Sequence, residues 1–161
     1  MMQHPKPIPS MESTSKEPLR LWLRLLKTNR LIEAELRERF RVKFSTTLPR
    51  FDVMSALYCN QIGLKMSELS RMLLVSNGNV TGIVDRLSKD GLMLRESVPG
   101  DRRAYRVRLT QKGIDEFLKQ AATHEIWVSE MLGGQDAETC AEISTLLART
   151  LTIGKEATDD D

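Results

Sequence analysis

The 161-residue sequence predicts a mainly α-helical fold that carries one small β-hairpin. Two observations support this prediction. Apolar residues recur at spacings of three and four over most of residues 18–153, which is the period of amphipathic helices. Between residues 92 and 109 the pattern changes to that of short strands, interrupted by the turn sequence Pro-Gly-Asp. We therefore expect several helices, then a hairpin, then further helices.

Composition predicts one soluble domain. The chain is 40% hydrophobic and 29% charged, which is typical of globular proteins. It has no stretch of about 18 apolar residues to cross a bilayer, and its opening lacks the apolar core of a signal peptide. We expect a disordered tail over residues 1–17, one domain over residues 18–153, an acidic tail over residues 154–161, and a cytoplasmic location.

Charge is segregated along the chain, although the net charge is only +2. Residues 1–70 hold 12 Lys and Arg against 7 Asp and Glu, and residues 71–110 hold 8 against 4. Residues 111–161 hold 4 against 11. A basic front and an acidic back suit binding to a polyanion on one side of the molecule.

Three helices are predicted before the hairpin. The first covers residues 18–44 and has a largely apolar face. The second begins at Pro49, because proline suits the first turn of a helix, and ends before Gly63. The third lies within residues 66–75, and its expected core side consists of Leu69, Met72 and Leu73.

A fourth helix follows Ser76, which is a suitable N-cap, and ends at Gly91. Its apolar residues at i, i+3, i+4 and i+7 are Val80, Ile83, Val84 and Leu87. Its other face carries short hydrogen-bonding side chains and a guanidinium, with Gly78 and Gly82 allowing close approach. Such side chains suit the edges of DNA bases. The candidate DNA-reading residues are Asn77, Asn79, Thr81 and Arg86.

The hairpin that follows is basic on one side. If Val107 and Leu109 face the core, then Arg106 and Arg108 face the other way. The turn is expected to project Arg102 and Arg103, and a narrow minor groove attracts arginine. A helix followed by such a hairpin predicts a winged helix-turn-helix that binds double-stranded DNA. Two alternatives stay open: the basic hairpin is a solvated face, or the winged helix is a module that docks protein.

Residues 66–113 also resemble the core of the MarR family of bacterial transcription regulators. The family's wing commonly shows an Asp-x-Arg element followed by a Val-x-Leu-Thr strand, and Asp101, Arg103 and residues 107–110 match it. The resemblance extends over residues 18–153. It implies that Arg103 enters the minor groove and that Asp101 orients it.

The resemblance also implies a homodimer. Residues 113–132 and 137–153 read as two helices separated at Gly133 and Gly134. In a MarR-like protein they would pair with the first helix of the other subunit. The two reading helices would then lie about one DNA turn apart, and the expected operator is a palindrome. We also expect the protein to act as a repressor.

MarR-like proteins commonly sense small aromatic or lipophilic molecules in a cleft between the dimerisation region and the winged domain. The apolar candidates for this cleft include Trp22, Leu26, Phe44, Met54 and Tyr58. Cations and an amide lie beside them in the sequence, at Arg24, Lys27, Asn29, Arg30 and Arg50.

An apolar cleft bordered by cations resembles the branch of the family that answers to hydroxycinnamoyl-CoA thioesters. An aryl group suits the apolar surface and CoA phosphates suit Lys and Arg. We therefore expect p-coumaroyl-CoA or feruloyl-CoA as effector. A free phenolic acid is the alternative, and these cations could also serve DNA phosphates or an ordinary solvated face.

The sequence shows no catalytic constellation, P-loop or dinucleotide fingerprint, so we expect no enzyme and no cofactor. An enzyme acting on a CoA ester is the alternative that turnover would reveal. His4 and His124 have no second histidine at metal-binding spacing, which argues against a metal site. Cys59 and Cys140 are expected to be buried cysteines rather than redox sensors.

Overall fold

The computed structural model describes residues 15–98, 100–133 and 135–153, and the side chains of residues 101–104 and 150–153 lie outside this description. The chain divides into two compact units, residues 1–35 and residues 36–161. The tail predicted over residues 154–161, and residues 1–14 of the tail predicted over residues 1–17, lie outside the described residues.

The predicted mainly helical fold with a small β part is confirmed. Among the described residues, six helices and three strands follow one another along the chain. Their bounds are α1 Glu17–Phe44, α2 Leu48–Cys59, β1 Leu64–Lys65, α3 Met66–Leu73, α4 Asn77–Lys89, β2 Met93–Val98, β3 Asp101–Leu109, α5 Gln111–Met131 and α6 Ala137–Ile153. None of the helices described here combines the length and apolarity needed to span a bilayer.

The described part of the first unit is the beginning of α1, and its apolar side chains are largely uncovered. Trp22 is 57% exposed, and Leu19 and Leu23 are also exposed. A helix in water usually buries its apolar face. This face therefore needs a partner beyond the unit that carries it.

An aromatic cluster fixes the helices of the second unit. Phe40, near the end of α1, is fully buried. Its ring centroid lies 4.8 Å from that of Phe51 in α2 and 5.4 Å, edge-on, from that of Trp127 in α5. Phe117 of α5 stacks on Phe51 at 5.5 Å. Aromatic pairs in such geometries add to the stability gained from burial alone, so this cluster joins α1, α2 and α5.

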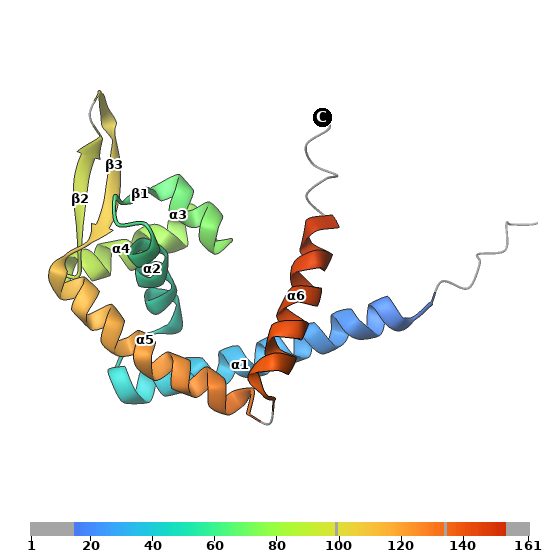
Figure 1. The fold of residues 1–161 in the computed structure, drawn as a ribbon. Coiled ribbons are helices and arrows are strands. Elements are labelled where there is room, and N and C mark those ends of the chain that lie inside the picture. Colours follow the sequence, from blue (N-terminus) through green and yellow to red (C-terminus); the bar gives the residue numbers. More distant parts are fainter. Residues whose placement is uncertain (1–14, 99, 134, 154–161) are drawn as a thin grey trace, which may run out of the picture. The chain divides into compact units, whose positions relative to one another are not determined.

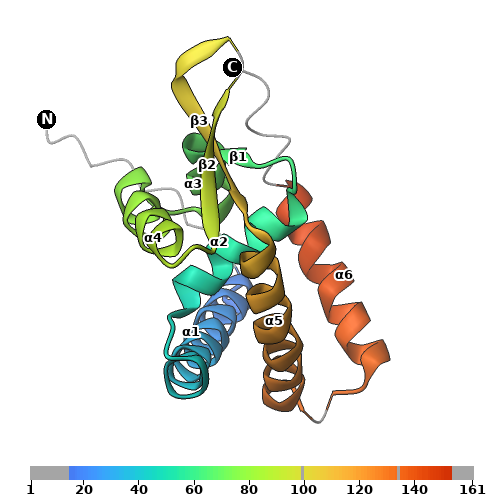
Figure 2. The same cartoon turned by 90° about the vertical axis from the view of Figure 1, so that its left-hand side faces the viewer.

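The three strands form an antiparallel sheet in the order β1-β3-β2. Val107 of β3 pairs with Leu64 of β1 and Arg95 of β2, and it is fully buried. The hairpin of β2 and β3 stands out beyond α2, α3 and α4 (Figure 1). Figure 2 shows α4 beside the strands and α5 leaving the foot of β3. The sheet thus anchors a projecting wing.

Strand β1 was not predicted from the sequence, because two residues are too few to show alternation. Gly63 leads into it with φ +90, and a Cβ at this position would lie 2.9 Å from the carbonyl oxygen of Val107. Only glycine accepts both the positive φ and the close approach of β3. Gly63 therefore belongs to the pairing of β1 rather than to the end of α2, which ends at Cys59.

Two local predictions are wrong. Met72 was placed on the core side of α3, yet it is 51% exposed. The buried side of α3 is centred on Leu69 and Ser70 instead, and Ser70 can be buried because its hydroxyl donates a hydrogen bond to Asn77. The hairpin turn was expected to hold Asp101, Arg102 and Arg103, but β3 begins at Asp101, which pairs with Val98. The turn is therefore shorter than the sequence indicates.

His124 of α5 makes stability depend on pH. Its ring lies 4.7 Å from Phe51 and 6.0 Å from Phe40, and burial lowers the pKa of His124 below its usual value of 6.5. The unfolded chain therefore binds more protons below about pH 6.5, and stability falls as the pH drops through that value.

We expect the melting temperature to fall more between about pH 7.5 and about pH 5.5 in the wild type than in His124→Gln, by roughly 2 °C. Thermal unfolding followed by circular dichroism measures this difference. Equal decreases in the two proteins would show that His124 stays as basic in the folded chain as in the unfolded one.

Candidate nucleic-acid interface and effector cavity

Helix α4 is fixed by a buried apolar stripe and by caps at both ends. Val80, Val84 and Leu87 have no exposed surface. The Ser76 hydroxyl accepts a hydrogen bond from the backbone N–H of Asn79 at 3.4 Å. At the other end Gly91 has φ +71, which suits the residue that follows the C-cap. The predicted N-cap and C-terminal stop are both confirmed.

The side of α4 opposite this stripe carries two glycines. At about 100° per residue, Gly78 and Gly82 lie four residues apart and point away from Val80 and Val84. A Cβ at either glycine would meet nothing within 4 Å. A flat partner could therefore approach the helix backbone closely along this line.

The four predicted DNA-reading residues of α4 are all exposed, but they are not equivalent. The Oδ1 atom of Asn77 accepts a hydrogen bond from Ser70 of α3 at 2.5 Å, and the Thr81 hydroxyl donates to the carbonyl oxygen of Asn77 at 2.8 Å. Within the described residues, the side chains of Asn79 and Arg86 make no hydrogen bond or ion pair. Asn79 and Arg86 are thus best placed for an external partner.

An ion pair ties the wing to α4. Arg95 of β2 pairs with Asp85 of α4, and its guanidinium lies 5.1 Å from the centre of the Tyr105 ring. The pair joins two elements across ten residues, and sequence reasoning did not find it. The opposite charges of Asp85 and Arg95, on a helix and on the strand that follows it, could have indicated the pair. The pair connects β2 of the hairpin to α4.

The predicted facing of β3 is confirmed. Val107 and Leu109 are buried, whereas Arg106 and Arg108 are partly exposed. Arg108 pairs with Glu96 across the hairpin at 2.6 Å, and this hydrogen bond lowers the pKa of Glu96. The three remaining DNA candidates, Asp101, Arg102 and Arg103, lie at the start of β3, and their side chains lie outside the described residues.

Both cysteines are more accessible than predicted. Cys59 is exposed and Cys140 is partly exposed. Cys59 is the last residue of α2 and lies beside an open groove of about 760 Å³ that Ile62, Met72 and Arg106 also line. The apolar residues of α2 that are buried, such as Met54 and Leu57, lie on its other side.

No group of three or more His, Cys, Asp or Glu that could hold a metal occurs among the described residues.

A smaller cavity of about 290 Å³ lies among the end of α1, α2, the end of α4 and the beginning of α5. Three predicted ligand residues, Phe44, Arg50 and Met54, line it. Tyr58 does not; its ring packs on Phe117 at 4.8 Å. The other predicted ligand residues belong to the separate unit of residues 1–35, and they are Trp22, Arg24, Leu26, Lys27, Asn29 and Arg30.

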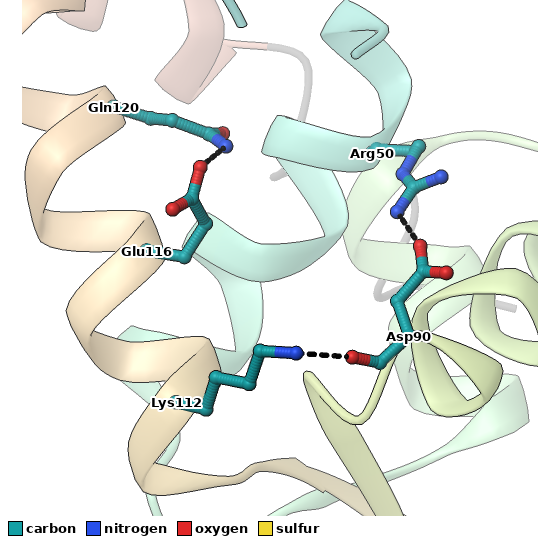
Figure 3. A network of polar contacts seen from close by, with 5 residues as sticks. All are labelled: Arg50, Asp90, Lys112, Glu116 and Gln120. Atoms are coloured by element: carbon teal, nitrogen blue, oxygen red, sulfur yellow. Dashed lines mark hydrogen bonds and ion pairs between the residues drawn. The ribbon is translucent and has the colours of Figure 1, made fainter. Parts of the chain in front are cut away.

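Sequence reasoning missed the polar network that lines the same cavity. Asp90 is its centre (Figure 3): its carboxylate pairs with Nη2 of Arg50, and its carbonyl oxygen accepts a hydrogen bond from Nζ of Lys112 at 2.8 Å. Gln120 donates to Glu116 at 2.8 Å. Lys112, Glu116 and Gln120 all lie on one face of α5, where helical spacing alone could have grouped them.

Two atoms of this network are buried without a hydrogen-bond partner. They are Nε of Arg50, a donor, and Oε1 of Gln120, an acceptor. Buried polar atoms in folded proteins are nearly always paired. The residues that carry these two atoms, Arg50 and Gln120, line the same cavity, which makes it a candidate site for a polar ligand.

These observations define the class of protein. Two short helices, α3 and α4, followed by a hairpin pinned to α4, are the winged helix-turn-helix arrangement of DNA-binding proteins. The MarR family model matches residues 46–105, which cover α2 to the first part of β3. Together with the relatives below, this match shows that the chain belongs to the MarR family of transcriptional regulators. The family places it among regulators rather than enzymes.

Two curated relatives come from Bacillus subtilis. The uncharacterized HTH-type transcriptional regulator YfiV is 30% identical over 118 residues, which cover 71% of this chain and 73% of that protein. The uncharacterized regulator YkoM is 28% identical over 99 residues, 62% of this chain and 64% of that protein. The match thus spans less than two thirds of the length of YkoM.

Solved structures share the fold. A MarR family regulator from Silicibacter pomeroyi is 30% identical with a TM-score of 0.72, covering 88% of this chain and 97% of that chain. A mutant of MarR from E. coli, complexed with operator DNA, is 24% identical with a TM-score of 0.71, covering 87% and 99%. The organohalide-sensing regulator RdhR, with bound 2,4-dichlorophenol, is 20% identical with a TM-score of 0.73, covering 99% and 94%.

Gly82→Ala is expected to change stability and DNA affinity in opposite directions. Alanine in this helix should raise the free energy of unfolding by about 0.5–1 kcal/mol, since its methyl group meets no neighbour. Operator affinity should fall, because the methyl group occupies the surface that the duplex approaches. Chemical denaturation and fluorescence anisotropy measure the two effects. A stabilised variant with undiminished operator affinity would exclude this face of α4 from the interface.

Proposed function

We propose that this MarR-family protein is a homodimeric repressor that binds a palindromic operator and is released from it by a small aromatic ligand. The observation that carries the DNA part is the outward face of α4. It combines the open line of Gly78 and Gly82 with the uncommitted side chains of Asn79 and Arg86. Amide and guanidinium groups recognise adenine and guanine edges in the major groove.

The wing supplies the second DNA contact in this proposal. Arg103 enters the minor groove, Asp101 orients it, and Arg102 adds a phosphate contact. The start of β3 carries all three residues at the projecting end of the hairpin (Figure 1). The Asp85–Arg95 pair supports this assignment, since it holds the hairpin beside the reading face of α4.

The second copy of the chain covers the exposed apolar faces of α1 and α6. Trp22 of α1 is exposed, and Leu146 of α6 is 61% exposed. Apolar helix faces of this length are rarely left in water by a monomer. A twofold dimer presents two copies of α4, and these match a palindrome whose half-sites lie about one DNA turn apart.

Titration of a promoter fragment from immediately upstream of the gene tests the DNA part. Fluorescence anisotropy at fixed salt should give tight binding of two chains, and scrambling one half-site should lower the affinity more than 100-fold. Arg103→Ala should cost roughly tenfold, which corresponds to about 1–2 kcal/mol. Lys119→Ala, an exposed change in α5, is the matched loss of charge.

Binding by a single chain would overturn the dimer. Wild-type affinity of Arg103→Ala would remove Arg103 from the interface. Equal affinity for scrambled and intact fragments would instead favour a winged helix that docks protein and binds DNA only by its charge.

The cavity beside α4 favours a single-ring phenolic acid as effector. Its volume of about 290 Å³ is at the small end of ligand sites. Phe44, Met54 and Leu87 give it apolar walls, and Arg50 offers a cation. The carboxylate of the ligand would accept from Nε of Arg50, and its hydroxyl would donate to Oε1 of Gln120. The phenol bound by RdhR supports a ligand of this size.

A hydroxycinnamoyl-CoA thioester, such as p-coumaroyl-CoA or feruloyl-CoA, is the second candidate. The exposed cations Arg24, Lys27 and Arg30 of α1 favour it, because they could hold the phosphates of CoA. Arg30→Ala would then weaken binding of the thioester and leave binding of the free acid unchanged.

Calorimetric titration with p-coumarate, p-coumaroyl-CoA and CoA decides between the two. We expect p-coumarate to bind, and Arg50→Gln to weaken it at least tenfold, since a hydrogen bond to a charged group contributes about 1.5–3 kcal/mol. Glu38→Gln, an exposed change away from the cavity, should leave the affinity as it is. Binding of the thioester alone would select the second candidate, and turnover of the thioester would make the protein an enzyme.

A further inference from the structure

Only part of the guanidinium of Arg50 is hydrogen-bonded. Its Nη2 atom pairs with the carboxylate of Asp90, while Nε is buried and unpaired. Nε–H and the nearer Nη2–H lie along one edge of a guanidinium and form two parallel hydrogen bonds with a carboxylate. A ligand carboxylate on this edge shares Nη2 with Asp90 and so competes with it for Arg50.

Asp90 occupies a position where its charge is unfavourable. It is the C-cap of α4, and a carboxylate at a helix C-terminus is repelled by the partial negative charge there. Two cations offset this repulsion: Arg50 pairs with the carboxylate, and Lys112 donates to the carbonyl oxygen of Asp90 (Figure 3). The end of α4 therefore depends on Arg50 being available.

We propose that the carboxylate of the effector takes Arg50 from Asp90, and that the released Asp90 loosens the last turn of α4. The inference rests on the effector cavity proposed above. It describes how a ligand in that cavity would change the contact between α4 and DNA. The last turn holds Arg86, a DNA candidate, and Leu87, whose side chain lines the cavity. The Leu87 carbonyl also accepts the hydrogen bond from Leu92 at 2.9 Å that closes the helix end.

The exchange predicts that removing Arg50 imitates the effector. Arg50→Gln should bind the operator roughly five- to tenfold more weakly in the absence of any ligand. Adding Asp90→Asn to Arg50→Gln should restore the affinity, because no carboxylate then remains at the helix end. Adding Glu38→Gln instead restores the same net charge far from α4, and it should restore nothing.

Operator titrations of these three variants, with hydrogen exchange of the amides of residues 86–92, carry the first test. Faster exchange in Arg50→Gln, reversed by Asp90→Asn, is the expected result. Unchanged operator affinity in Arg50→Gln would overturn the proposal. Equal rescue by Asp90→Asn and Glu38→Gln would also overturn it, since the effect would then be one of net charge.

Titration of p-coumarate into free and operator-bound protein carries the second test, which also serves if Arg50→Gln does not fold. In the wild type the two dissociation constants should differ by about fivefold or more, and in Asp90→Asn by less than about twofold. Undiminished coupling in Asp90→Asn would refute the exchange. Absence of p-coumarate binding to the wild type would refute the proposed effector, and the ligand-free variants would then decide the role of the Arg50–Asp90 pair.

Discussion

The burial of Val80, Val84 and Leu87 is the constraint on which the functional surface depends. These three side chains fix the rotation of α4 about its own axis, because any turn of the helix would expose them to water at a cost of several kcal/mol. With that rotation fixed, Gly78 and Gly82 must face outward and Arg86 must flank them. The apolar core thus determines which side of α4 a duplex can meet.

The two ends of α4 are held by different kinds of contact. At the beginning, Ser76 caps the helix and Asn77 is bonded to α3, so that the helix-turn-helix is locally closed. At the end, Gly91 allows the chain to turn, while the carboxylate of Asp90 pairs with Arg50 of α2 and its carbonyl oxygen accepts from Lys112 of α5. The first end is held by residues close in the sequence, whereas the second contacts residues that also line a cavity.

The chemistry of that cavity constrains what can occupy it. Its cations, Arg50 and Lys112, are matched by the carboxylates of Asp90 and Glu116. A purely apolar molecule would leave the unpaired atoms of Arg50 and Gln120 buried without partners, which is unfavourable. A ligand with an anionic group and a hydroxyl would satisfy both atoms.

The sequence by itself determined the helices, the caps Ser76 and Gly91 and the facing of Val107, because periodicity and capping depend on residues within a few positions of one another. Only the tertiary structure decided the two-residue strand β1, the exposure of Met72 and Cys59, and the Arg50–Asp90 pair, whose members lie 40 residues apart. A charge pair across that distance leaves no periodic trace in a sequence. It exists only because packing of α2 against α4 brings the two side chains to one place.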